Sequence, residues 1–398
     1  MHPADEIRGV KSKRLAKKRI VFGITGSIAA IDSVKLSREL IRHGAEVFPV
    51  MTHSATKIIH PDSLEFATGN KPIIELTGKT EHVSFCGRVK EPADLFIISP
   101  CTANTISKIA HGIDDTSVTT FATTAIGSGM PMLIVPAMHL SMYDHEIVQK
   151  NVLRCKKAGI RFVEPLIQEN KAKMANIDEI IAYVIRDADK HSMADKRVLI
   201  IGGSSAEAID DVRIISNRSS GKTAITLAKS FFYRGADVEL WYGCSKEPVP
   251  NYLKNVNFET VRDVVDLLKA REIKNFGVII ICAALSDYIP KKIDGKLSSN
   301  EKKLILEMSP APKIIAMLRE KAPSSKIIGF KLEENSDKLQ NKAYSLLKKN
   351  NLDFVIANTI SGLNNDKNEV CVIDKKGDII HKTGKKEQLA DWISDIVK

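Results

Sequence analysis

The sequence predicts an α/β protein made of two tandem Rossmann-like domains. In both halves of the chain, short apolar runs typical of buried strands alternate with amphipathic segments typical of helices. Such alternation is characteristic of parallel sheets covered by helices. A Gly- and Ser-rich turn follows the first apolar run of each half. The chain has 398 residues, of which 43% are apolar, enough to form two separate cores.

The first half begins with a βαβ unit. Residues 19–25 form an apolar run, and residues 28–43 follow with helical periodicity and Gly44 at the expected C-terminal position. A second strand is predicted at 46–51, and the crossover between the two strands should be right-handed. The other elements predicted in this half are strands at 94–99, 132–135 and 162–165 and helices at 103–111 and 177–189.

A polar stretch without apolar periodicity, residues 190–196, separates the two halves. The second half opens with a strand at 197–201 and a helix at 221–233. Later elements are strands at 237–241, 277–283 and 353–357, a hairpin at 369–381 and a final helix at 386–397. The expected domains are a basic tail at 1–18, a first domain at 19–190 and a second domain at 191–398.

Charge and composition narrow the classes of function. The net charge is +11, and residues 1–19 hold seven basic side chains against two acidic ones. A terminal segment of this kind is typically a flexible, solvated arm. Aromatic residues make up only 6% of the chain, which does not favour single-stranded nucleic acid as the partner. A basic surface serves anionic small substrates equally well.

Membrane and disulfide-rich classes are also disfavoured. No stretch approaches the roughly 20 apolar residues that a membrane helix needs, and the N-terminus lacks the apolar stretch of a secretory signal. Six scattered cysteines without a Cys-x-x-Cys pair indicate neither a disulfide scaffold nor a structural zinc site. We therefore expect a cytoplasmic globular protein.

The turn after the first strand has the features of a phosphate site. Gly26 and Ser27 place backbone amides and a hydroxyl at the start of a helix. The polar segments 99–105 and 135–143 follow later strands, and open α/β sheets bind ligands at such carboxyl ends. The turn is neither G-x-G-x-x-G nor a Walker loop, so a turn without a ligand is the alternative.

Four motifs in order give the first half a family resemblance. The motifs GITGSIAA (23–30), His82, SPCTANTISKIAHGIDD (99–115) and PAMHLSMY (136–143) together resemble the phosphopantothenoylcysteine decarboxylases, which are flavin-dependent cysteine decarboxylases. The resemblance implies a flavodoxin-like domain that binds FMN. It implies that FMN takes electrons from the cysteinyl group, that carbon dioxide leaves, and that the electrons return to the enethiol.

The same resemblance assigns roles to residues of the first half. His82 matches the catalytic histidine, and His139 and Met142 fall on substrate-binding positions. The FMN contacts of the family map to Gly26, Ser27, Ile28, Thr52, Thr102, Asn104 and Met138.

Two departures from the family pattern affect the carboxylate anchor and the proton donor. His139 stands where the family has an asparagine that holds the substrate carboxylate. The family's flap cysteine, a proton donor, has no counterpart in residues 164–176. Either Lys171, Lys173 or solvent donates the proton, or the first domain is impaired.

The second half also has hydroxyl-rich and basic segments at a predicted helix N-terminus, around residues 201–207 and 215–222. An ordinary Ser- and Gly-rich loop would look similar. The full set of segments in this half resembles the phosphopantothenate–cysteine ligases. Besides those two segments, it comprises AALSDY (283–288), GKLSS (295–299), SPAPKI (309–314), GFKLE (329–333) and VIAN (355–358).

The resemblance implies a two-step ligation. The carboxylate of 4′-phosphopantothenate attacks the α-phosphate of CTP, giving an acyl-cytidylate and pyrophosphate, and the amine of L-cysteine displaces CMP. Asn217 would stabilise the acyl nucleotide, Lys296 would support activation with positive charge, and Asp287 would serve the nucleotide or its Mg²⁺. Further nucleotide contacts map to Gly202, Ser204, Ala311, Phe330 and Lys342.

Some ligase positions depart from the family pattern. Leu346 and Asn350 occupy positions where family members often carry lysines, and Ala311-Pro312-Lys313 replaces Asn-Pro-Asp. The choice between CTP and ATP is therefore open.

Together the halves resemble a bifunctional enzyme of coenzyme A biosynthesis, in which the ligase makes the substrate of the decarboxylase. Family members form flavin-domain trimers and ligase-domain dimers, and hence dodecamers, so self-association is implied. The alternative is an active ligase fused to an impaired or regulatory flavoprotein domain.

Overall fold

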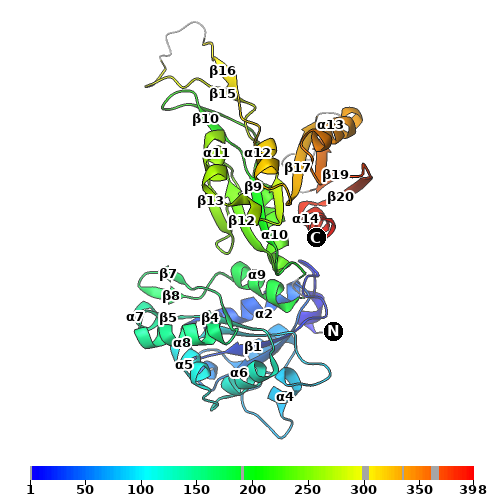
Figure 1. Cartoon of the computed structure of the whole chain (residues 1–398). Helices are drawn as coiled ribbons and strands as arrows, with labels where there is room; N and C mark the ends of the chain where they lie inside the picture. The colour runs from blue at the N-terminus through cyan, green and yellow to red at the C-terminus, as the bar shows by residue number, and fades with distance from the viewer. Residues whose placement is uncertain (1, 190–191, 298–303, 334–335, 360–366) are drawn as a thin grey trace. The chain divides into compact units, whose positions relative to one another are not determined.

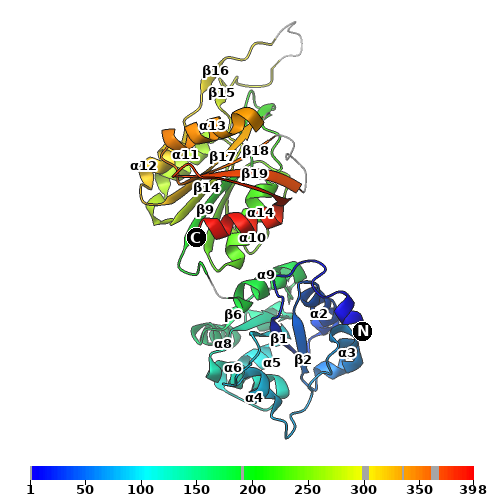
Figure 2. The same cartoon turned by 90° about the vertical axis from the view of Figure 1, so that its right-hand side faces the viewer.

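The computed structural model describes residues 2–189, 192–297, 304–333, 336–359 and 367–398. Contacts within the chain divide it into two compact units, Met1–Lys190 and His191–Lys398 (Figures 1 and 2). Each unit is an α/β domain with a mostly parallel central sheet, which confirms the predicted fold class. None of the helices in the described ranges combines the length and apolar character that crossing a membrane requires.

The first unit contains a five-stranded parallel sheet with the strand order β2-β1-β3-β4-β6. This is the order of a flavodoxin-like fold, and it reverses between β1 and β3. Ligands of such sheets bind beside the reversal, at the carboxyl ends of the strands. The strands are β1 (Arg19–Ile24), β2 (Glu46–Met51), β3 (Leu95–Cys101), β4 (Met132–Pro136) and β6 (Arg161–Phe162).

Helices cover both faces of this sheet (Figure 1). Helices α2 and α9 pack on one face, and α5, α6 and α8 bury the other face around Phe96 and Phe121. The helix predicted at 28–43 is a 3-10 turn, η1, followed by α2. The helical elements are η1 (Ile28–Asp32), α2 (Ser33–Arg42), α3 (Pro61–Thr68), α4 (Glu81–Cys86), α5 (Ala103–His111), α6 (Ser117–Ser128), α7 (Leu140–Tyr143), α8 (Glu146–Lys157) and α9 (Ile177–Ala188).

The basic N-terminal segment is folded onto the first unit. Its short helix α1 (Pro3–Glu6) packs against α3, and Ala4 and Leu15 are completely buried. The Leu15 N–H also donates to the carbonyl of His43 at 2.9 Å. The expectation of a flexible arm at 1–18 is therefore wrong, because these apolar side chains and backbone bonds fix the segment to the end of α2.

The second unit contains an eight-stranded sheet with the order β13-β12-β9-β14-β17-β18-β19-β20. Strands β13 to β18 pair in parallel, and the predicted C-terminal hairpin, β19 and β20, adds two antiparallel strands at one edge. The strands are β9 (Arg197–Gly202), β12 (Asp237–Tyr242), β13 (Lys254–Asn257), β14 (Val278–Ile281), β17 (Lys326–Glu333), β18 (Phe354–Thr359), β19 (Lys367–Asp374) and β20 (Ile379–Lys385).

Helices again lie on both faces of the sheet (Figure 2). Helices α10 and α14 pack together on one face, whereas α11, α12 and α13 enclose a core with Trp241 on the other. The helices are α10 (Lys222–Tyr233), α11 (Val261–Ala270), α12 (Ile314–Lys321), α13 (Ser336–Lys349) and α14 (Lys386–Ile396).

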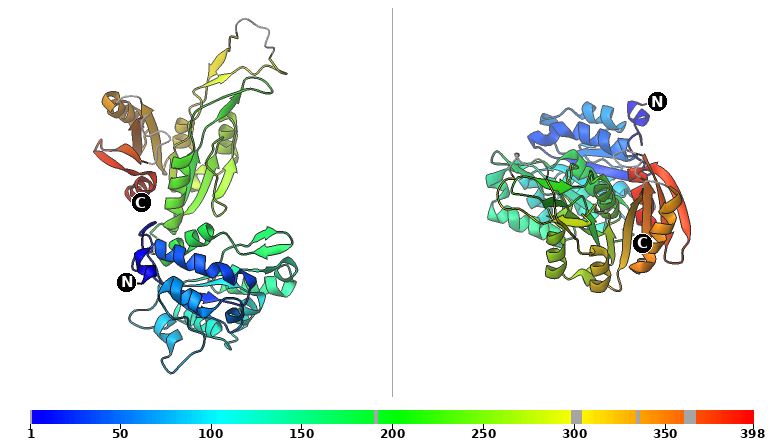
Figure 3. Two further views of the ribbon diagram at one scale, coloured as in Figure 1. Left: turned by 180° about the vertical axis from the view of Figure 1, so that it is seen from behind. Right: turned by 90° about the horizontal axis from the view of Figure 1, so that it is seen from above.

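Two short antiparallel pairs project from the second unit (Figures 1 and 3). One joins β10 (Ala206–Ala208) to β11 (Ile214–Ser216), and the other joins β15 (Tyr288–Pro290) to β16 (Met308–Pro310). Both pairs carry segments of the ligase resemblance. Residues 298 and 299 of the GKLSS motif lie outside the described residues.

Candidate functional sites

The predicted phosphate turn of the first unit lies at the carboxyl edge of the sheet, beside the reversal of strand order. The hydroxyl of Thr25, directly after β1, donates to Pro100 O at 2.8 Å and accepts from the Thr102 N–H at 3.1 Å. The hydroxyl of Ser27 donates to Ala137 O, after β4, at 3.2 Å. The structure therefore brings the predicted residues Ser27 and Thr102 to one edge, linked by Thr25, which the sequence analysis missed.

The turn itself is shaped by close contacts. A Cβ at Gly26 would lie 2.6 Å from the Cβ of Ser54, so no larger residue fits there. The side chain of Ser27 does not cap η1, and the Ile28 side chain at the start of η1 is 75% exposed. A Gly-containing turn at the start of a helical segment is the kind of place where a phosphate group binds. Thr52 joins the same edge, since its N–H donates to Ile24 O at 3.0 Å.

His82 lies on the short helix α4. Its ring packs edge-on against Phe121 of α6, with the ring centroids 6.5 Å apart. Ser117, at the start of α6, donates its hydroxyl hydrogen to Met51 O at 2.7 Å, which fixes α6 to the end of β2. The Nδ1 atom of His82 is buried and has no hydrogen-bond partner among the described residues. A buried imidazole nitrogen without a partner is costly, and a ligand could supply the missing partner.

The flap region forms a small sheet that includes His139. Strands β7 (Leu166–Gln168) and β8 (Lys171–Lys173) form a hairpin, and β8 also pairs with β5 (Met138–His139). In this register His139 lies opposite Lys171. Lys173 forms an ion pair with Glu169 at 2.7 Å. The two departures from the family pattern are therefore adjacent in space.

The remaining predicted residues of this half lie on the neighbouring helices. Met142 is 47% exposed on α7, and Asn104 is exposed on α5 just after Thr102. The cysteines of this unit, Cys86, Cys101 and Cys155, are buried in its core and do not lie on a flap. Burial raises the pKa of Cys86 to about 12 and that of Cys155 to about 11, so both are neutral thiols at neutral pH.

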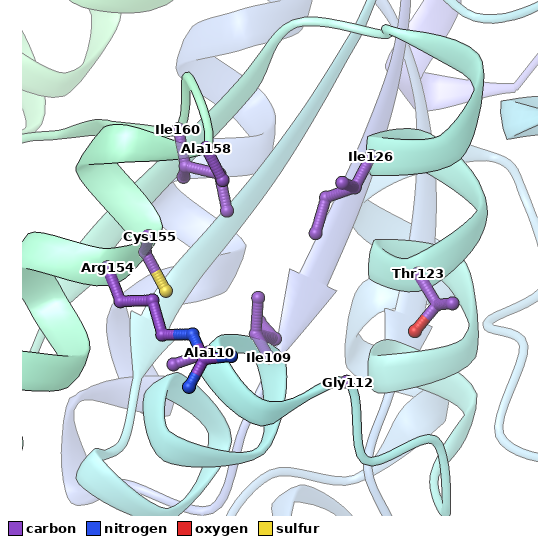
Figure 4. Close-up of a pocket in the computed structure, with 9 residues that line it drawn as sticks. All are labelled: Ile109, Ala110, Gly112, Thr123, Ile126, Arg154, Cys155, Ala158 and Ile160. Carbon is purple, nitrogen blue, oxygen red and sulfur yellow. The ribbon is translucent and has the colours of Figure 1, made fainter.

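A cavity of about 210 Å³ lies between α5, α6 and α8 (Figure 4). Its lining includes Ile109, Ile126 and Ile160, with Arg154 at the side. None of the residues predicted to contact FMN lines it.

In the second unit, hydroxyl groups gather at the carboxyl ends of β9 and β14. Ser205 Oγ donates to Ser286 Oγ at 3.0 Å, and Ser216 Oγ donates to Ser205 O at 2.6 Å. Ser204, a predicted nucleotide contact, is buried and donates to Cys244 O. Gly202 is the last residue of β9 and lies two residues before Ser204 in the chain. The sequence motifs placed these segments nearby, but they did not show that the hydroxyls bond to one another.

Gly221 marks the start of α10 beside this cluster. Its φ of 78° is left-handed, and a Cβ there would lie 2.0 Å from Tyr242 Oη. Only glycine fits, so the start of α10 is held against β12. Such a terminus suits a phosphate group.

Asn217 follows β11 and reaches the same edge. Its side-chain Nδ2 donates to Ala284 O at 2.8 Å, and Ala284 forms a parallel bridge with Ser204. This hydrogen bond fixes the orientation of the Asn217 side chain, which lies beside the hydroxyl cluster.

Asp287 pairs with Lys313, a residue that the sequence analysis noted only as a departure. The Asp287 Oδ1 to Lys313 Nζ distance is 2.7 Å, and both side chains are mostly exposed. Ala311 N–H donates to Asp287 O at 2.9 Å, which joins two predicted nucleotide contacts. Within the described ranges, no group of three His, Cys, Asp or Glu side chains is arranged to hold a metal ion.

Lys342 reaches the end of β17, the strand that contains Phe330. Glu333 accepts Lys342 Nζ at 2.6 Å and Lys331 Nζ at 2.9 Å, and these hydrogen bonds, led by that of Lys342, lower the pKa of Glu333. By contrast, Leu346 packs on the core, so this position has a structural role.

Lys296 does not lie beside Asn217. Leu297, the next residue, bonds to Asp210 in the turn between β10 and β11. Asn217 follows the other end of this pair, where Ala206 lies opposite Ser216. The two residues predicted to be catalytic in the ligase half are thus at opposite ends of the β10–β11 pair.

These features define a class of protein: a two-domain α/β protein with a hydroxyl-rich strand edge in each domain. Family comparison agrees with this division. The first half matches the family described as Flavoprotein over residues 9–189, and the second matches the DNA/pantothenate metabolism flavoprotein C-terminal domain over residues 193–398.

Relatives match the whole chain. The chain is 44% identical over 380 residues to the coenzyme A biosynthesis bifunctional protein CoaBC of Thermococcus kodakarensis, covering 94% of this chain and 93% of the relative. It is 40% identical over 405 residues to the protein of the same name from Methanocaldococcus jannaschii, covering 100% and 98%. A solved C-terminal domain of CoaBC is 26% identical, with a TM-score of 0.45, and covers 52% of this chain and 96% of that structure.

The chain belongs to the CoaBC family of bifunctional coenzyme A biosynthesis proteins. This confirms the family predicted from the motifs. It also confirms the two predicted enzyme activities, phosphopantothenoylcysteine decarboxylase and phosphopantothenate–cysteine ligase.

Proposed function

We propose that the first domain binds FMN at the carboxyl edge of β1 and β3, and that the second activates 4′-phosphopantothenate with CTP and Mg²⁺. The observation that carries this proposal is the convergence of hydroxyl groups at one strand edge in each domain, where α/β sheets bind phosphate-bearing ligands.

The residues of the first domain fit a flavin nucleotide. Gly26, Ser27 and Ile28 would hold its phosphate, because Gly26 keeps the turn tight and the Ile28 side chain is exposed. The bound flavin would take up and return the electrons of the reaction. The positions that would flank its ring are Thr52, Thr102, Asn104 and Met138.

The decarboxylase chemistry that the protein supplies is positioning and proton transfer. The buried, unpartnered Nδ1 of His82 gives a ring nitrogen that can bond to substrate and act as base. His139 would hold the substrate carboxylate with an imidazole N–H, and Met142 would line the same site. Lys171, opposite His139, adds positive charge beside that carboxylate.

In the ligase domain, positive charge and amide donors would act on the phosphates. Asn217 would bond to the acyl-cytidylate, and Lys296 would stabilise charge on the phosphates as it develops. Asp287 is a single carboxylate, so Mg²⁺ would arrive bound to the triphosphate and gain one ligand here. The remaining nucleotide contacts would be Gly202, Ser204, Ala311, Phe330 and Lys342.

Self-association belongs to the same proposal. The separation of Lys296 from Asn217 within one chain is compatible with a site shared by two ligase domains, as the family resemblance implies. Sedimentation velocity of the full chain tests whether it forms oligomers.

One experiment tests the proposed function. The purified chain is incubated with 4′-phosphopantothenate and L-cysteine, with either CTP or ATP and with or without Mg²⁺, and the products are identified by mass spectrometry. We expect a yellow protein that forms 4′-phosphopantetheine, CMP and pyrophosphate only when CTP and Mg²⁺ are both present. Equal turnover with ATP would overturn the nucleotide assignment. A colourless protein that stops at 4′-phosphopantothenoylcysteine would overturn the flavin assignment and support an impaired first domain.

A further inference from the structure

A turn and a loop close on each other at the end of the β10–β11 pair that lies away from Asn217. The turn is residues 209–213, and the loop is residues 291–297, which follows β15. The loop backbone is joined to the turn by two hydrogen bonds, from Ile293 N–H to Ile209 O at 2.9 Å and from Asp211 N–H to Gly295 O at 3.1 Å. The loop is therefore docked on the turn along its length.

Two carboxylates of the 209–213 turn hold the residues on either side of Lys296. Asp211 Oδ2 accepts the Gly295 N–H at 3.0 Å, and Asp210 Oδ2 accepts the Leu297 N–H at 3.0 Å. The backbone is thus tied down directly before and directly after Lys296. Lys296 itself is exposed, and no residue in the described part of the chain forms an ion pair with it.

Asp210 is itself rigidly held. Its carboxylate is completely buried and accepts the Val212 N–H at 2.8 Å, the Arg213 N–H at 2.5 Å and the Arg213 guanidinium at 2.5 Å. Burial alone raises the pKa of the Asp210 carboxyl, but its hydrogen bonds, led by that from the Leu297 N–H, hold the pKa well below its usual range. The carboxylate is therefore charged and fully bonded at neutral pH.

Asp211 also pairs with one of the three lysines of the loop, which are Lys291, Lys292 and Lys296. Its Oδ1 pairs with Lys292 Nζ at 2.7 Å, so that ammonium is already neutralised. Lys296 lies between the two bonded amides and, like Lys291 at the start of the loop, forms no ion pair among the described residues.

We infer that Asp210 and Asp211 are positioning residues that fix Lys296 for the ligase reaction. The backbone amides before and after Lys296 are both hydrogen-bonded, so its backbone position is fixed. Only the torsion angles of the Lys296 side chain are then left to adjust to the nucleotide phosphates. The inference rests on the proposed role of Lys296. A misplacement of about 1 Å in such a group costs up to about 10²-fold in rate.

The test uses the full chain and the release of pyrophosphate from CTP and 4′-phosphopantothenate. Asp211→Ala is the leading variant, because this side chain is 53% exposed and its loss should be tolerated by the fold. We expect kcat to fall about tenfold or more, with little change in the KM for 4′-phosphopantothenate. Asp294→Asn, which removes an exposed carboxylate from the same loop, is the matched control and should behave as wild type.

A double-mutant cycle separates positioning from general stability. If Asp211 acts through Lys296, then Asp211→Ala has no further effect in the Lys296→Ala background. Losses that simply add would overturn the inference. Wild-type ligation by Lys296→Ala alone would instead overturn the proposed role of Lys296.

Hydrogen exchange gives a readout that does not depend on turnover. The amides of residues 291–297 should exchange faster in Asp211→Ala and in the more conservative Asp210→Asn, but not in Lys296→Ala. Unchanged exchange in both aspartate variants would show that the carboxylates do not hold the loop. Circular dichroism of each variant confirms that the fold is intact.

Discussion

Replacement of Asn217 by alanine should stop ligation while leaving the second domain folded. In the structure, the side chain makes one hydrogen bond, from Nδ2 to Ala284 O at 2.8 Å, at an exposed position. The net contribution of such a bond to the free energy of unfolding is about 0.5–1.5 kcal/mol. A domain of this size would lose about 2–4 °C in Tm for each 1 kcal/mol.

The expected effect on catalysis is much larger than this structural cost. Loss of one donor to a developing negative charge typically lowers the rate by about 10²–10³-fold, or about 2.7–4 kcal/mol. Native domains are stable by about 5–15 kcal/mol, so a loss of about 1 kcal/mol leaves nearly all molecules folded. Any decrease in ligation of this size must therefore come from the site and not from unfolding.

The assay compares Asn217→Ala with wild type and with Asn255→Ala. Asn255 is an exposed asparagine on β13 that donates to Asn257 Oδ1 at 3.1 Å, so it loses a similar bond in the same domain. Thermal unfolding, flavin absorbance and formation of 4′-phosphopantothenoylcysteine are measured for each. Ligation near the wild-type rate in Asn217→Ala, or an equal loss in Asn255→Ala, would refute the reasoning.

Three further predictions concern the first domain. His82→Asn should stay yellow but lose carbon dioxide release by about 10²–10⁴-fold, and unchanged turnover would remove the assignment of His82 as base. The double variant Lys171→Ala, Lys173→Ala should still reoxidise its flavin in a single turnover, because Lys173 is engaged with Glu169; a bleached flavin with an accumulated enethiol would identify a lysine as the proton donor. Burial, followed by the charge of Lys11, lowers the pKa of His43 from 6.5 to about 4, so below about pH 6.5 the unfolded chain binds a proton that the folded chain does not. The free energy of unfolding should therefore decrease as the pH falls from about 6.5 to about 4, by up to about 3 kcal/mol before solvent screening is allowed for, and His43→Gln should remove this part of the pH dependence in urea titrations.

Elements with strong local signals could be predicted from the sequence. The strand at 46–51 and the helix at 103–111 have the predicted bounds, as β2 and α5. Their signals are local: a continuous apolar run for the strand, and a Thr102 cap with Gly112 at the end for the helix.

Helix α6 shows why other elements were missed. Its sequence is rich in threonine and other residues with low helix propensity, so periodicity does not reveal it. It is stabilised by a reciprocal pair of bonds, from Thr119 N–H to Thr116 Oγ1 at 3.2 Å and from Thr116 N–H to Thr119 Oγ1 at 2.9 Å. Burial of Phe121 against the sheet adds the tertiary contact that local propensity does not encode.

The candidate sites show the same division between local and non-local information. The motifs correctly placed Ser27 and Asn217 in turns after strands, because the order of strands and turns along the chain can be taken from the sequence. The bond between Thr25 and Thr102, however, requires that β1 and β3 be neighbours. The separation of Lys296 from Asn217 likewise depends on the β10–β11 pair, which has only three residue pairs.

In the first domain, the two departures from the family pattern lie in the same small sheet, formed by β5, β7 and β8. His139 is distant from residues 164–176 in sequence, yet the pairing of β5 with β8 sets it opposite Lys171. The exchange of an amide for an imidazole and the loss of a thiol therefore fall in one small sheet of the first domain. Lys173 is already engaged with Glu169 at 2.7 Å, and solvent remains as a candidate proton donor when both lysine side chains are removed. The lysine variants are therefore expected to keep turning over.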